Sequence, residues 1–173
     1  MQIEPLTDER FAPYGVVLGA PFPGSEPSSA FSNAGSDFWR VGTFDPGTDG
    51  QTEVLWVTYR NASLVVTALE VHWLTEQAIV PLRGGDLIHV VANTLPGATS
   101  LPDLKTLRAF RVESGQGVCM NPGCWHASFT ANDEVLCQML TRTSTTRELV
   151  SLLTNGEPAR ETTIVKVDPV TIR

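Results

Sequence analysis

The chain has three histidines, and two of them stand where acid–base or metal-binding chemistry would need them. His72 follows Glu70 with one residue between them, Gln77 comes a few positions later, and His126 lies farther along the chain. In an extended strand, side chains alternate between the two faces, so Glu70 and His72 are expected to share one face. A carboxylate, an amide and two imidazoles are therefore the candidates for a reactive site.

These side chains fit two kinds of chemistry. Histidine titrates near neutral pH and can give or take a proton, and a carboxylate can orient it or act as a base. Two neutral imidazoles and one carboxylate also form a ligand set for divalent metals. The amide of Gln77 is a poorer ligand, so catalysis with and without a metal at Glu70, His72, Gln77 and His126 both remain open. The third histidine, His89, is interpreted as structural.

The elements that would position these residues are predicted to be strands. Glycine and proline, 14 and 12 residues, divide the chain into short segments. Short strands with turn signals between them are typical of a β-sandwich or barrel rather than of alternating strands and helices. The runs of strand length are Val54–Tyr59, Leu64–Leu69, Ala78–Leu82, Leu87–Ala92, Leu107–Val112 and Glu134–Thr141.

Helical signals are few. Thr7 is a candidate N-cap before two acidic residues, which predicts a short helix ending near Gly15. Thr145 and Glu148 have the spacing of a capping box and precede the apolar stretch Leu149–Leu153, which predicts a second helix.

Three further segments complete the predicted organisation. Gly19–Asn33 and Pro46–Thr52 are rich in turn-forming residues and are predicted to be loops. Thr162–Val167 is either a strand that closes the barrel or a tail. No linker or repeat divides the chain, so we expect one domain over residues 1–173.

Composition excludes several classes of partner. The net charge of −7 and the absence of a basic cluster argue against nucleic acid. No apolar run reaches the roughly 18–20 residues of a membrane helix, and the N-terminus lacks a signal peptide. Three cysteines without a CxxC pair predict neither disulfides nor a zinc site with cysteine ligands, so we expect a cytoplasmic protein. Cys124 is interpreted as an inert buried thiol in preference to a nucleophile paired with His126.

Two motifs resemble those of the cupin superfamily. Glu70, His72, Gln77 and Gly84 have the spacing of the first cupin motif, and Gly115, Asn121-Pro122-Gly123 and His126 that of the second. The resemblance implies an all-β fold, a cupin-type double-stranded β-helix or jelly-roll barrel with a few short helices. In such barrels the four site residues point inward from neighbouring strands.

Longer stretches resemble the ureidoglycolate lyase family. That resemblance implies a carbon–nitrogen lyase that releases urea and glyoxylate from ureidoglycolate in allantoin (purine) breakdown, and a homodimer. His72 and His126 would then be the acid–base residues, Glu70 the base or orienting partner, and Gln77 a hydrogen-bonding residue. The stretches that carry the resemblance are Pro5–Gly15, Ala68–Leu82, Pro102–Phe110, Gly115–Val118 and Trp125-His126.

The substrate carboxylate would need a cation or backbone donors, for which Arg40 and Arg108 are candidates, with Asn121 as a further substrate-binding residue. The chain departs from the family pattern around Asn121, at Ala127 and near Arg40. The alternative is therefore a diverged cupin that acts on, or only binds, another small α-hydroxy or ureido acid. No cofactor is required, and a divalent metal at the four site residues is optional.

Overall fold

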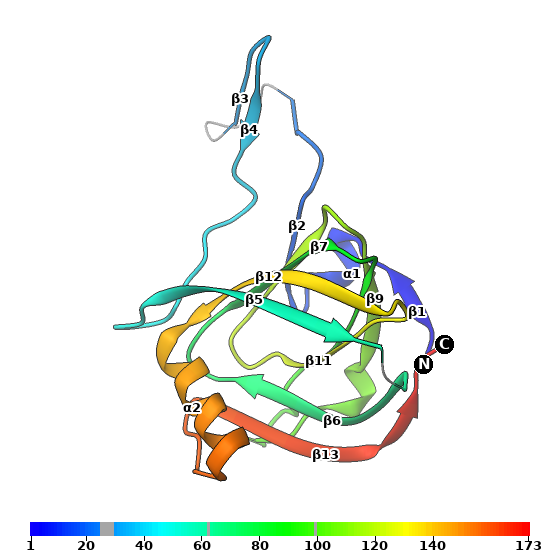
Figure 1. Cartoon of the computed structure of the whole chain (residues 1–173), viewed down its shortest axis with the longest axis vertical. Helices are drawn as coiled ribbons and strands as arrows, with labels where there is room; N and C mark the ends of the chain where they lie inside the picture. The colour runs from blue at the N-terminus through cyan, green and yellow to red at the C-terminus, as the bar shows by residue number, and fades with distance from the viewer. Residues whose placement is uncertain (25–29, 62, 99) are drawn as a thin grey trace.

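The computed structural model describes residues 1–24, 30–61, 63–98 and 100–173. The described chain is built mainly of strands (Figure 1). The elements are β1 (Ile3–Pro5), α1 (Asp8–Phe11), β2 (Gly15–Leu18), β3 (Ala30–Ser32), β4 (Asp37–Trp39), β5 (Thr52–Arg60), β6 (Val65–His72), β7 (Gln77–Arg83), β8 (Leu87–Ala92), the short 3₁₀-helix η1 (Leu104–Thr106), β9 (Arg108–Val112), β10 (Gly117–Met120), β11 (Trp125–Phe129), β12 (Glu134–Arg142), α2 (Thr143–Asn155) and β13 (Thr162–Thr171).

Two sheets form the barrel. The six-stranded sheet has the order β1-β9-β8-β11-β6-β13, and the five-stranded sheet has the order β2-β10-β7-β12-β5. Successive strands from β5 to β8 alternate between the two sheets, and so do β10 to β13. This alternation is the winding of a double-stranded β-helix, or jelly roll. The predicted cupin-type barrel is confirmed.

The alternation of side chains along the strands explains where the core lies. In β5, Leu55 and Val57 turn inward and pack against the interior cluster, to which Met139 of β12 belongs. Their neighbours Val54 and Trp56 turn outward and are 58% and 64% exposed. The interior between the sheets is therefore apolar along most of its length, which makes its few polar side chains conspicuous.

Both helices lie where the sequence predicts them, but the predicted cap of the second helix is wrong. Thr7 caps α1 as predicted, with its hydroxyl accepting from the Arg10 amide. The predicted capping box of α2 is wrong, because the helix begins at Thr143 and Thr145 is buried within its first turn. The Thr145 hydroxyl instead donates to Glu161, a residue far along the sequence. None of the described helices is long and apolar enough to cross a membrane.

The closing segment is a strand. Thr162–Val167 belongs to β13, which pairs antiparallel with β6 and forms the edge of the six-stranded sheet. The predicted loop Gly19–Asn33 contains β3, which pairs with β4 in a hairpin that extends away from the barrel (Figure 1). Residues 25–29 of that loop lie outside the described residues.

Two glycines of the cupin motifs have clear backbone reasons. Gly84 has φ of +95°, and a Cβ at this position would lie 2.2 Å from the carbonyl oxygen of Glu134. Gly123 has φ of +82°, in the turn where its amide donates to the His72 carbonyl. Left-handed backbone favours glycine, so Gly84 fixes the turn after β7, which carries Gln77, and Gly123 fixes the turn before β11, which carries His126.

Candidate functional site in the barrel interior

The barrel brings Glu70, His72 and His126 together from two adjacent strands. Glu70 and His72 lie on β6, and His126 lies on β11 directly opposite Glu70. His126 Nε2 is 3.3 Å from Glu70 Oε1, and the two imidazole rings are 5.2 Å apart between centroids. One ligand atom from each of the three residues fits within 4.8 Å of the others. The pairing of β6 with β11 thus creates the cluster.

Glu70 and His72 line a cavity of about 170 Å³. Glu70, His72 and Gln77 form its polar side, and α2 contributes Thr145 and Leu149 at its end. Its other lining residues are Leu55, Val57, Tyr59, Met139, Thr141 and Thr146. A second cavity shares Tyr59 and Glu70 with the first and also reaches His126, so the cluster is accessible from two directions.

The hydrogen bonds of the histidines define what each ring can do. His126 Nδ1 lies 3.1 Å from the carbonyl oxygen of Cys124, which can only accept, so Nδ1 carries a hydrogen. His72 Nδ1 lies 3.0 Å from Thr162 Oγ1. The Nε2 atoms of both rings are buried; His72 Nε2 finds no hydrogen-bond partner among the described residues, whereas His126 Nε2 faces Glu70 Oε1 at 3.3 Å. The His72 Nε2 atom is therefore available to a ligand, and so is the His126 Nε2 atom where a ligand replaces its contact with Glu70.

The ionisation states follow from burial and mutual contact. Burial raises the pKa of Glu70, but the hydrogen bond with His126 and the charges of His126 and His72 outweigh it and lower the pKa to about 2. Burial, reinforced by the charge of His126, lowers the pKa of His72 to about 4. Near neutral pH, Glu70 is a carboxylate and His72 a neutral imidazole.

His89 lies behind this cluster. Its ring stacks on that of His126, with centroids 5.8 Å apart and planes at 27°. Nδ1 lies 3.0 Å from Ser128 Oγ, and Nε2 lies 3.0 Å from Met120 Sδ. Both ring nitrogens are thus engaged, as the structural interpretation of this residue requires.

The cluster fits a divalent metal. Two imidazole nitrogens and one carboxylate oxygen are a recognised donor set, and one such atom from each of Glu70, His72 and His126 lies within 4.8 Å of the others. Gln77 is buried and lines the same cavity as Glu70 and His72. These residues can therefore hold an ion, a substrate, or both.

The three residues predicted to bind substrate lie elsewhere in this structure. Arg40 is exposed next to β4, in the hairpin that leaves the barrel. Arg108 forms an ion pair with Glu4, and Asn121 is exposed in the turn before β11. None of them is among the described residues that line the cavity around Glu70. The places of these three residues depend on which strands pair, and strand pairing joins segments that are distant in the sequence.

Cys124 is buried, and burial raises the pKa of its thiol to about 12. It offers His126 its backbone carbonyl, while its Sγ lies 3.7 Å from the Trp125 carbonyl oxygen. The thiol stays protonated at neutral pH, which agrees with the interpretation as an inert residue.

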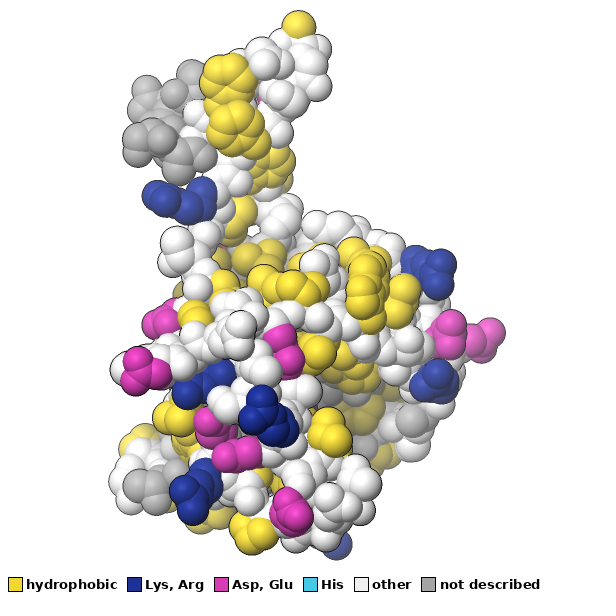
Figure 2. Space-filling model, turned by 60° about the vertical axis from the view of Figure 1, so that its left-hand side comes forward, with side chains coloured by type: hydrophobic (Ala, Val, Ile, Leu, Met, Phe, Trp, Pro, Cys, Tyr) yellow, Lys and Arg dark blue, Asp and Glu magenta, His cyan; other side chains and the backbone are white. Residues whose placement is uncertain are grey.

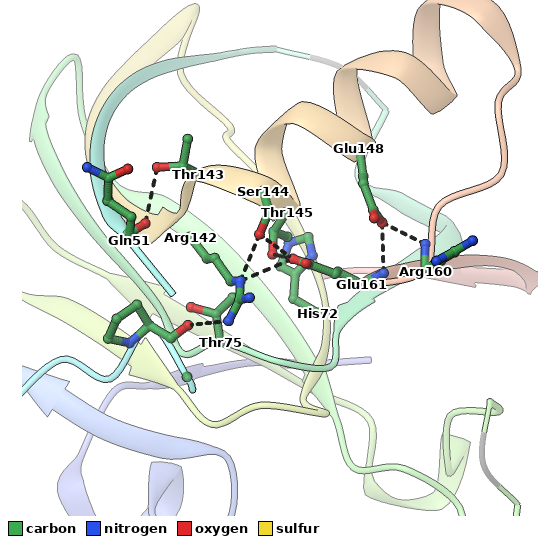
Figure 3. Close-up of polar contacts among 12 residues, drawn as sticks. Gln51, His72, Thr75, Arg142, Thr143, Ser144, Thr145, Glu148, Arg160 and Glu161 are labelled. Carbon is green, nitrogen blue, oxygen red and sulfur yellow. Dashed lines mark hydrogen bonds and ion pairs between the residues drawn. The ribbon is translucent and has the colours of Figure 1, made fainter. Parts of the chain in front are cut away.

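The sequence did not reveal how β13 and α2 support the site. Glu161, just before β13, accepts from Ser144 Oγ at 3.0 Å and from Thr145 Oγ1 at 2.5 Å, with Arg142 Nε 3.5 Å away (Figure 3). The next residue, Thr162, contacts His72. One segment therefore fixes both the helix at the cavity end and a cluster histidine.

The chain is similar in sequence to known ureidoglycolate lyases. A model of the ureidoglycolate lyase family matches residues 1–154. The ureidoglycolate lyase of Pseudomonas fluorescens (strain Pf0-1) is 31% identical over 129 residues, covering 73% of this chain and 74% of that protein. That of Stutzerimonas stutzeri (strain A1501) is 34% identical over 132 residues, covering 73% and 72%. A solved dTDP-4-dehydrorhamnose 3,5-epimerase from Elizabethkingia anophelis NUHP1 is 11% identical, with a TM-score of 0.41 and 72% of each chain covered.

Proposed function

This chain belongs to the ureidoglycolate lyase family, and we propose that it releases urea from ureidoglycolate and leaves glyoxylate. The observation that supports this most directly is the buried Nε2 atom of His72, which has no partner among the described residues, next to the close contact between His126 Nε2 and the Glu70 carboxylate. Proton transfer needs such groups within reach of a bound substrate.

The reaction requires two proton movements. The central carbon of ureidoglycolate carries a hydroxyl, a carboxylate and a ureido nitrogen. As the hydroxyl loses its proton, its oxygen forms the carbonyl of glyoxylate, the carbon–nitrogen bond breaks, and the departing nitrogen takes a proton. No water is consumed, and the products are glyoxylate and urea.

The residues of the cluster divide these tasks. His72 is neutral, and its Nε2 has no partner among the described residues, so we propose that it accepts the proton of the substrate hydroxyl. His126 carries a hydrogen on Nδ1 and turns Nε2 toward Glu70, so its protonated form would deliver a proton to the departing nitrogen. Glu70 stabilises that charged ring. Gln77 would hydrogen-bond a substrate oxygen from the same cavity.

We propose a divalent metal ion at Glu70, His72 and His126, with Gln77 beside them, as the alternative to proton transfer by the two histidines, because an Nε2 atom that binds a metal cannot also transfer a proton. A bound ion would supply polarisation of a substrate oxygen. Elemental analysis of protein purified without a histidine tag tests this. We expect close to one equivalent of metal in the wild type and a large loss in His72→Ala. Wild-type protein free of metal and fully active in chelator would contradict it.

The test of the activity is an incubation with racemic ureidoglycolate, with and without a chelator, in which glyoxylate, urea and ammonia are measured separately. Enzyme-dependent glyoxylate and urea in equal amounts, without ammonia, are expected. Ammonia in place of urea would show hydrolysis of the ureido group instead. No acceleration over the spontaneous rate would rule out this substrate.

We propose that the protein is a homodimer. Hydrophobic side chains lie along the projecting hairpin and on the barrel below it (Figure 2). Phe31 and Phe38 stack on each other yet are 47% and 60% exposed, and Trp56 on the outer face is 64% exposed. Apolar surface of this kind is typical of interfaces. Light scattering should give about twice the chain mass of 18.8 kDa, and less for Phe38→Ser with Trp56→Ser. A wild-type mass of one chain would contradict the dimer.

We place this reaction in allantoin breakdown, a part of purine catabolism, and in the cytoplasm. The three cysteines, Cys119, Cys124 and Cys137, are free and buried, which fits a reducing compartment. Fractionation of the native organism, followed by assay of ureidoglycolate cleavage, tests the location. Activity confined to another fraction would contradict it.

A further inference from the structure

Two buried oxygen atoms of paired residues on β5 and β12 lack hydrogen bonds among the described residues. Thr141 Oγ1 and Glu53 Oε1 are buried and have no partner among the described residues. Thr141 is 2% exposed and lines the cavity that also contains Glu70 and His72. Glu53 is its direct cross-strand neighbour, so both side chains lie on the barrel-facing side of the five-stranded sheet.

The hydrogen-bonding capacity of this pair shows what is missing. A hydroxyl offers one donor and two acceptor positions, and a carboxylate only accepts. Even if Thr141 donates to Glu53, the pair keeps several unused acceptor positions and no further hydrogen. A ligand that completes this part of the cavity must therefore bring N–H or O–H donors.

The surrounding charges argue against a carboxylate in this place. Besides Glu53, the first turn of α2 already faces an internal carboxylate, since Glu161 accepts from Ser144 and Thr145 (Figure 3). Arg142, the residue after Thr141, lies 3.5 Å from Glu161 and also donates to the carbonyl oxygens of Pro46 and Thr48. A second anion would therefore meet the carboxylates of Glu53 and Glu161, with the Arg142 guanidinium already engaged.

We propose that Thr141 and Glu53 form the subsite for the terminal carbamoyl NH₂ of a ureido acid, the part that leaves as urea. This deepens the proposed function and rests on it for the identity of the substrate. A carbamoyl NH₂ is neutral and brings two hydrogens to a pair whose acceptor positions outnumber its single donor. The cavity reaches from Thr141 to His72 and Glu70, so the carbon that bears the hydroxyl would lie at the histidine end.

Non-reacting probes test the subsite without turnover. N-Carbamoylglycine lacks the hydroxyl from which the reaction starts, and N-acetylglycine replaces its terminal NH₂ by a methyl group. Calorimetric titration of the wild type should show tighter binding of N-carbamoylglycine by about 10-fold or more, the effect of a hydrogen bond to a charged group. Guanidinoacetate, with a cationic group in that place, should bind more weakly than N-carbamoylglycine.

Two variants place the preference at these residues. Thr141→Val and Glu53→Gln should each remove most of the preference for N-carbamoylglycine over N-acetylglycine. Thr154→Val, at the exposed far end of α2, is the matched control and should keep it. Thr141→Val keeps the side-chain shape and removes an unpaired hydroxyl, so its melting temperature should not fall. A substantial drop would indicate a structural role for the hydroxyl and overturn the proposal.

The remaining outcomes separate this subsite from the proposed reaction. Equal binding of the two probes to the wild type, binding of neither, tighter binding of guanidinoacetate, or an unchanged preference in Thr141→Val each overturns the subsite. If the preference is present and lost in Thr141→Val, but ureidoglycolate is not cleaved, the subsite stands and the proposed function fails. If ureidoglycolate is cleaved but the wild type shows no preference for N-carbamoylglycine, the proposed function stands and the subsite fails.

Discussion

Two cavities of nearly equal volume lie on opposite faces of the five-stranded sheet, and they differ in chemistry. The inner cavity, about 170 Å³, contains Glu70, His72 and Gln77. The outer one, about 180 Å³, is lined mostly by apolar side chains, with Cys119 and Glu76 as exceptions. Size alone therefore does not identify the site.

The difference between the cavities lies in unmet hydrogen bonding. In the inner cavity, His72 Nε2 and Thr141 Oγ1 are buried without a partner among the described residues. In the outer cavity, Cys119 Sγ contacts Glu76 Oε2 at 3.6 Å, and that oxygen also accepts from the Asp45 amide at 2.8 Å. Polar groups left open in an otherwise packed interior indicate where a ligand belongs.

The largest expected effect is on catalysis. His126→Ala should lower kcat/KM for ureidoglycolate by about 100- to 10,000-fold, because it removes a proton-transfer group. Cys119→Ala, in the outer cavity, should change kcat/KM less than about twofold. Steady-state kinetics on both variants, with circular dichroism as a folding control, make the comparison. Unchanged activity in His126→Ala would show that the inner cavity is not the active site.

A smaller effect is expected where β13 supports the inner cavity. Glu161→Ala removes the acceptor for the Ser144 and Thr145 hydroxyls and should lower the free energy of unfolding by about 2 kcal/mol. It should also raise KM, since α2 closes one end of the cavity. Urea denaturation and kinetics measure both. Asp168→Ala, at an exposed position of the same strand, is the control and should have little effect on either.

The smallest effect concerns the outer cavity and pH. Burial, with Glu76 adding to it, raises the pKa of the Cys119 thiol from its ordinary value of 9.0 to about 12. Between these values the unfolded chain has lost the thiol proton and the folded chain retains it. The contribution of this group to stability is therefore full below about pH 9 and decreases as pH rises toward 12.

Cys119→Ala should accordingly reduce the loss of stability between pH 8 and pH 10, measured by urea denaturation at both values. The remaining loss would come from groups such as Cys137, whose pKa burial raises to about 11. An identical pH dependence in wild type and variant would show that the Cys119 thiol is not desolvated as the structure indicates.

The strands were largely predictable because their signal is local. The predicted runs at Val54–Tyr59 and Glu134–Thr141 lie within β5 and β12, and Leu87–Ala92 coincides with β8. β11, which carries His126, was not among the predicted strands. It spans only five residues, and its position depends on pairing with β8 and β6 rather than on its own composition.

Contacts between distant residues explain the errors. The capping-box pattern at Thr145 and Glu148 satisfies local spacing, yet Thr145 donates to Glu161 and Glu148 accepts from the amides of Arg160 and Glu161. Arg108 was a reasonable partner for a carboxylate, but Glu4 occupies it. The sequence around Thr145 and Arg108 does not indicate that Glu161 and Glu4 are their partners, because these partners are distant in the sequence.

The sequence by itself determined the strand pattern, the inward alternation of Glu70 and His72, and the motif spacing that singled out Gln77 and His126. Each of these is encoded within a short stretch, as side-chain periodicity or as glycines at turns. Only the tertiary structure decided that His126 faces Glu70, that Arg40 and Arg108 lie outside the cavity, and that Thr141 is left without a partner. Those facts depend on which strands pair and on which buried groups find hydrogen bonds, and both are properties of the whole folded chain.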